Sequence, residues 1–136
     1  GSFLFQQAVP AIKQGFKPNT ISTDLHTGSM NGGMKDIVNV MSKLLNMDMS
    51  LSEILMATTW TSAQTIKRDD LGHLSVGAVA DITILNLREG DFGFIDTKGK
   101  KMKGNKKLEC ELTIRDGQVV YDLNGLAAPL WDQQKN

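Results

Sequence analysis

Cysteine and histidine are scarce in this 136-residue sequence, which has one cysteine and two histidines. Cys110 has no second cysteine to pair with, so an internal disulfide is excluded and a reducing, cytoplasmic setting is expected. The histidines, His26 and His73, do not form a His-x-His pair. Because imidazole is a common ligand of catalytic zinc, this chain has little material for a complete metal site.

Net charge and long apolar runs are also lacking. Fifteen basic side chains balance fifteen acidic ones, which argues against a nucleic-acid or membrane partner. No apolar run approaches the roughly 18 residues of a membrane-spanning helix, and no signal peptide is visible. The sequence is 40% hydrophobic, and a chain of this length can bury a real core. We therefore expect a globular protein.

Helices are predicted where apolar residues recur at three- and four-residue spacing. Ser2 is a possible N-cap of the first helix, although Pro10 would kink that helix or shift its start. Ser50 and Glu53 fit a capping box, and a similar pattern begins at Thr61. The predicted helices cover residues 2–16, 35–47, 50–59 and 61–67.

Strands are predicted mainly in the second half, where the periodicity becomes alternating after residue 68. We place a domain boundary there, which gives domains 1–68 and 69–136. Asp116-Gly117 fits a two-residue hairpin turn. The predicted strands cover residues 20–24, 80–87, 92–95, 108–115 and 118–122.

The first of these strands ends at Asp24, ahead of a loop rich in glycine and serine. A carboxylate at a strand end can face a pocket, and His26 would lie on the same face of a continuing strand. Gly28 and Ser29 could line the same pocket. Asp24 could instead cap the following loop as an ordinary Asx turn, and a lone histidine is more often a loop residue. The residues alone leave both interpretations open.

Five segments, in this order, resemble the amidohydrolase superfamily of metal-dependent hydrolases, in its deacetylase and dihydroorotase-like branch. They cover nearly the whole chain: Ser22-Thr23-Asp24-Leu25-His26, Met41-Ser42-Lys43-Leu44-Leu45, Leu71-Gly72-His73-Leu74, Gly77-Ala78-Val79-Ala80-Asp81-Ile82 and Leu112-Thr113-Ile114-Arg115-Asp116-Gly117.

The resemblance implies an α/β plus β fold. A complete (β/α)₈ TIM-type barrel needs about 250 residues, so only a C-terminal fragment of one is expected here. It would comprise the last barrel strand and its helices, followed by part of a β-sandwich domain.

The resemblance also implies a mechanism for a full-length parent. Asp24 would bind a divalent metal, zinc by expectation, and act as general base and then acid in cleaving an amide or ester of a small molecule. His26, Gly28 and Ser29 would bind the substrate. The family's His-x-His pair and further histidines are missing here, so the metal-ligand set is incomplete. We expect the isolated chain to be inactive.

Two other classes of function stay open. The first is a non-catalytic scaffold or oligomerisation module with an amidohydrolase-like fold, and a homo-oligomer is compatible with either interpretation. The second concerns the six lysines between Lys98 and Lys107, which could bind phosphate or nucleic acid. Since no aromatic residues are interleaved with them, we expect a solvated hairpin tip between Ile95 and Leu108 instead.

Overall fold

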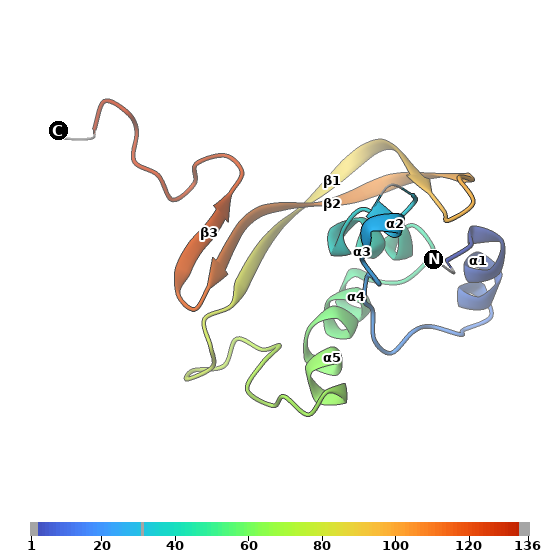
Figure 1. Ribbon diagram of the computed structural model, residues 1–136, viewed down its shortest axis with the longest axis horizontal. Helices are drawn as coiled ribbons and strands as arrows, with labels where there is room; N and C mark the ends of the chain where they lie inside the picture. The colour runs from blue at the N-terminus through green and yellow to red at the C-terminus, as the bar shows by residue number, and fades with distance from the viewer. Residues whose placement is uncertain (1–2, 31, 134–136) are drawn as a thin grey trace.

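The structure is a computed structural model that describes residues 3–30 and 32–133. Helices gather on one side of the molecule, and two long strands arch over α3 toward a third strand near the C-terminal end (Figure 1). The described elements are α1 (Phe5–Lys13), α2 (Thr27–Met30), α3 (Ile37–Leu45), α4 (Leu51–Thr58), α5 (Trp60–Thr65), β1 (Ile82–Ile95), β2 (Lys101–Arg115) and β3 (Gln118–Asp122). No helix in the described ranges has the length and apolar character needed to cross a membrane.

Local capping signals explain where two of the helices begin. The Ser50 hydroxyl accepts from the Glu53 backbone N–H at 3.2 Å, and the Glu53 carboxylate accepts from the Ser50 N–H at 2.8 Å, which confirms the predicted capping box of α4. Asp36 caps α3 by accepting from the Asn39 N–H at 2.6 Å. Because each cap satisfies amides that have no partner inside the helix, these short helices have defined starts.

The first and last helices differ from prediction. Helix α1 contains Pro10 and begins at Phe5, and the predicted Ser2 cap lies outside the described residues. The capping pattern predicted at Thr61 is wrong, because α5 follows α4 almost directly and starts at Trp60. Thr61 therefore lies within the first turn of α5, where the Thr59 carbonyl already accepts from the Ala63 N–H at 2.9 Å.

The three strands form one antiparallel sheet in the order β1-β2-β3. Asp116 and Gly117 make the predicted turn between β2 and β3, with φ angles of 48° and 77°. The predicted alternation of buried and exposed residues along β2 fails at Glu111. Ile84 pairs with Leu112 and the next residue of β1 pairs with Cys110, so Glu111 has no partner on β1. The resulting bulge turns Glu111 inward, where only 9% of it is exposed and its carboxylate accepts hydrogen bonds from two asparagine side chains.

The predicted break between strands 80–87 and 92–95 and the predicted lysine tip both need correction. Strand β1 is continuous, and a register shift between Glu89 and Phe92 occupies the predicted break. The turn to β2 spans only residues 96–100, so Lys101 to Lys107 lie within β2 and pair with β1. Pairing with a long partner strand extends β2 through a lysine-rich sequence that has weak strand propensity of its own.

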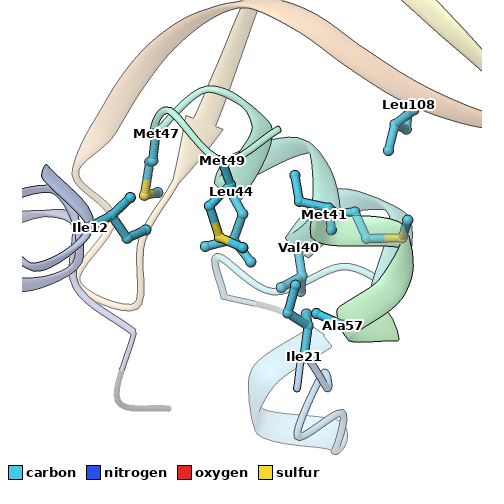
Figure 2. Close-up of a cluster of buried hydrophobic side chains, with 10 residues drawn as sticks. Ile12, Ile21, Val40, Met41, Leu44, Met47, Met49, Ala57 and Leu108 are labelled. Atoms are coloured by element: carbon cyan, nitrogen blue, oxygen red, sulfur yellow. The ribbon is translucent and has the colours of Figure 1, made fainter. Parts of the chain in front are cut away.

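Helix α3 lies at the centre of the core and is attached to β2 by polar contacts. The Ser42 hydroxyl accepts from the Leu108 N–H at 2.9 Å, and the Asn46 side chain donates to the Lys106 carbonyl at 2.7 Å. Leu108 approaches α3 from β2 (Figure 2). The buried cluster takes residues from helices, loops and sheet: Ile12, Ile21, Val40, Met41, Leu44, Met47, Met49, Ile54, Ala57 and Leu108.

The strand predicted at Thr20–Asp24 is absent from the described structure, which shows one antiparallel sheet and no parallel barrel strand. Ile21 donates its N–H to the Ala57 carbonyl at 3.0 Å, but no strand runs alongside to complete a ladder. A strand requires a hydrogen-bonded neighbour, so a β-prone sequence without one stays an irregular extended segment. The second layer of a β-sandwich is likewise absent from residues 3–30 and 32–133, and the division into two domains at residue 68 stays a prediction.

Candidate active site

The four residues predicted to form the site, Asp24, His26, Gly28 and Ser29, line one cavity of about 340 Å³. They come from the segment after Ile21 and from α2 (Figure 1). The other lining residues come from the start of the chain, α3 and the β1–β2 turn: Phe3, Ser22, Thr23, Gly32, Gly33, Met34, Val40, Lys43 and Thr97.

Asp24 does not cap the loop that follows it. The loop N–H groups of Leu25, His26 and Gly28 instead donate to Thr23 Oγ1 (3.1 Å), Ser29 Oγ (2.9 Å) and His26 Nδ1 (3.2 Å). Asp24 is exposed and lines the cavity, and within the described part of the chain no group donates a hydrogen bond to its carboxylate. Its oxygens can therefore accept from a ligand.

The loop reaches this arrangement through a sharp turn at Asp24. Asp24 has a φ of 48°, in the left-handed region that Asp and Asn tolerate better than most residues. The prediction that His26 shares a face with Asp24 assumed a continuing strand, and that geometry is wrong because the chain turns here. The two residues nevertheless line the same cavity.

His26 is held by its own loop. Its Nδ1 accepts from the Gly28 N–H, so a neutral ring carries its proton on Nε2 and can donate from there. A Cβ at position 28 would lie 3.1 Å from His26 Cε1, so a larger residue there would push against the ring. The single proton of the Ser29 hydroxyl is shared between the carbonyls of Asp24 (3.2 Å) and His26 (3.0 Å), so Ser29 stabilises the loop as well as lining the cavity.

Sequence reasoning missed Lys43, the cation of the cavity. It is 1% exposed, and its Nζ donates to the Gly33 carbonyl. Burial lowers the pKa of the Lys43 ammonium below its usual value, although the charge of Asp96 opposes this change. A signal was present in the sequence, because position 43 follows Val40 by three residues and precedes Met47 by four, and this spacing places it on the buried helix face.

The β1–β2 turn supplies a second missed feature, the buried carboxylate of Asp96, which is 2% exposed. Burial by itself would raise the pKa of Asp96, but N–H donors from Lys100, Phe5 and Lys98 keep that pKa below its usual value. Next to it, the Thr97 hydroxyl donates to the Phe3 carbonyl at 2.7 Å. The turn therefore fixes the start of the chain against the cavity.

A complete metal site is not formed by these residues. Within residues 3–30 and 32–133, no group of three or more His, Cys, Asp and Glu side chains is placed to hold a metal ion. Asp24 can supply one oxygen ligand. The donor set of this chain therefore does not by itself fit a catalytic divalent metal.

The amidohydrolase family model matches residues 19–121. This chain belongs to the amidohydrolase family. It is 40% identical over 119 residues to a deacetylase of Brucella anthropi, which covers 88% of this chain and 30% of that protein. A deacetylase of Enterococcus faecalis is 30% identical over 122 residues, covering 89% of this chain and 33% of the relative. These matches confirm the predicted resemblance.

Solved amidohydrolase-like structures show the same arrangement of elements. The crystal structure of an adenine deaminase superposes with a TM-score of 0.83 at 29% identity, covering 90% of this amidohydrolase chain and 33% of the other. A dihydroorotase gives a TM-score of 0.81 at 34% identity, with coverage of 89% and 33%. The chain thus spans about a third of the length of these proteins. The amidohydrolase family is typically metal-dependent.

Proposed function

We propose that a longer protein containing this chain hydrolyses an amide or ester of a small molecule, in the manner of a deacetylase, and that Asp24 moves the proton. One observation supports the assignment to Asp24: this exposed residue lines the cavity, while the surrounding loop amides donate their hydrogen bonds to other acceptors. Family membership supports the reaction class.

The chemistry requires one group that first accepts and then returns a proton. Asp24 takes a proton from the water that attacks the acyl carbon, so that a C–O bond forms. It then delivers this proton to the leaving nitrogen or oxygen as the scissile bond breaks. His26 lines the same cavity, and because its Nδ1 accepts from the Gly28 N–H, its Nε2–H can donate to the substrate's acyl oxygen.

We propose a divalent metal ion, with zinc as the expected one, only for the longer protein. Asp24 would supply one oxygen ligand, and the remaining ligands would come from outside the described residues, because these form no complete site. When bound, such an ion supplies Lewis-acid polarisation of the acyl group. The 136-residue chain is proposed to be inactive by itself.

The test is Asp24→Asn in the longer protein. Asparagine keeps the size and one oxygen ligand but is essentially non-basic, so kcat should fall by at least about 10²-fold, the lower range for general acid–base catalysis. The metal content should fall much less than kcat. Both quantities are measured for the variant and the unmodified protein, with circular dichroism to check folding.

Asp116→Asn is the matched control. Asp116 is also exposed and has the same φ of 48°, but it lies in the β2–β3 turn and does not line the cavity. Its substitution should leave kcat unchanged. Near-normal kcat in Asp24→Asn with metal retained would remove Asp24 from the chemistry, and an unmodified longer protein that hydrolyses no acyl compound would favour the scaffold alternative.

A further inference from the structure

The Lys43 ammonium is a buried charge that has no direct counter-ion among the residues that the structure describes. The ion pairs within the described ranges join other residues, Lys17 with Glu53, Arg68 with Asp70 and Arg88 with Glu109. Lys43 is 1% exposed yet lines the cavity, and among the described residues its ammonium donates a hydrogen bond to the Gly33 carbonyl alone. An ammonium has three donors, and buried charges are normally paired, so Lys43 has both spare donors and an unbalanced charge among the described residues.

The nearest candidates within the protein do not complete it. Asp96 acts on Lys43 through its charge, but its two oxygens accept from the N–H groups of Phe5, Lys98 and Lys100. The Phe3 ring lies 5.9 Å from the Lys43 Nζ, which gives only a weak cation–π contact. Burial, with a smaller contribution from the charge of Lys35, therefore prevails over these partners and lowers the pKa of Lys43.

We propose that Lys43 is the cation of an anion-binding subsite in this cavity, and that its ligand is a carboxylate carried by the substrate. The statement that this ligand is a substrate rests on the proposed hydrolase function. Phe3, Met34 and Val40 give the cavity apolar lining for the body of such a molecule, and Asp24 lies at the same cavity for the acyl group. The substrate class is thus an acylated compound with a free carboxylate.

Benzoate and benzamide test the subsite on the 136-residue chain without any need for hydrolysis. They have nearly the same shape, and only benzoate is charged. We expect benzoate to bind at least about 10-fold more tightly, which corresponds to about 1.4 kcal/mol, and to shift the NMR signal of the Lys43 Cε–H₂ group. Equal binding of the two probes, no saturable binding of benzoate, or binding that leaves the Lys43 signal unchanged would overturn the proposal.

Lys43→Met removes the charge at similar length, and Lys35→Met is its matched control. Lys35 is exposed, donates at 3.5 Å to the carbonyl of Met30, the last residue of α2, and does not line the cavity. The preference for benzoate should vanish in Lys43→Met and persist in Lys35→Met, and its survival in Lys43→Met would refute the subsite. If Lys43→Met does not fold, the two probes and the Lys43 signal of the unmodified chain still decide. Failure of the hydrolase proposal would appear separately, as missing turnover with benzoate binding intact.

Discussion

Asn46→Asp should weaken the attachment of the sheet to the helices. Asn46 lies at the C-terminal cap of α3, and its Nδ2 donates to the carbonyls of Ser42 and Lys106, both at 2.7 Å. Its Oδ1 accepts from the N–H groups of Asn105 at 3.0 Å and Lys106 at 3.2 Å. Aspartate has the same shape but no donors, so it keeps the second pair of bonds and loses the first.

The magnitude follows from these contacts. Two lost hydrogen bonds cost about 1 kcal/mol each, and a negative charge at the C-terminus of α3 adds about 0.5 kcal/mol through the helix dipole. The two remaining bonds become charge-assisted and offset part of this loss. The expected net decrease in the free energy of unfolding is about 2 kcal/mol.

Urea denaturation followed by circular dichroism measures this change, through the midpoint at an unchanged m-value. Asn105→Asp is the control, because Asn105 takes part in the contact only through its backbone N–H, which the substitution keeps, and its exposed side chain has no hydrogen bond in the described structure. The control should shift stability by less than about 0.5 kcal/mol. A loss below that value in Asn46→Asp would refute the account of how α3 holds β2.

Two further substitutions test the close approach at Gly33 and the ion pair of α4. Gly33→Ala should destabilise the chain by about 1–3 kcal/mol, because the new Cβ would lie 2.3 Å from the Ile95 carbonyl oxygen. Gly32→Ala is the control, since its Cβ meets nothing nearer than 3.5 Å and its effect should be mild. Thermal unfolding of both variants measures the difference. Lys17 and the Ser50 cap lower the pKa of Glu53 to about 2, so Glu53 stabilises the folded state above its usual pKa of 4.5, and this contribution is lost as the pH falls from there to about 2. Glu53→Gln should remove that part of the acid dependence of the urea midpoint, and an unchanged acid dependence would contradict the assignment.

The features that the sequence predicted correctly depend on neighbours in the chain. The Ser50–Glu53 capping box closes over three residues, and the Asp116-Gly117 turn over two. In both cases the residue type itself satisfies an amide or permits a positive φ, so no distant contact is needed. These signals fixed the start of α4 and the β2–β3 hairpin.

The features that were missed depend on partners far away in sequence. The β2 alternation failed because the pairing with β1 places an extra residue at Glu111, and Asn86 and Asn124 then satisfy its carboxylate. The expected strand before Asp24 failed for the opposite reason, because no partner strand lies beside it in the described structure. Propensity alone cannot supply a register or a neighbour.

The candidate site shows the same division. Asp24, His26, Gly28 and Ser29 could be grouped from the sequence because they occupy one short segment, and the structure places all four on one cavity. Lys43 was accessible through helix periodicity, whereas Thr97 could not be found this way. Its hydroxyl donates to the Phe3 carbonyl across 94 positions of sequence, and no local sequence pattern predicts such a contact.

The long-range contacts bear on how the cavity is built. Phe3 and Thr97 both line it, and Thr97 holds the Phe3 carbonyl through its N–H at 3.2 Å and its hydroxyl at 2.7 Å. The neighbouring Asp96 accepts from the Phe5 N–H at 3.3 Å. The same β1–β2 hairpin also contributes Leu108 to the core against α3. The turn of the hairpin therefore contacts the cavity, while β2, farther along its length, packs on the helices. The cavity around Asp24 is therefore a product of both parts of the chain, even though every site residue predicted from the sequence came from the first.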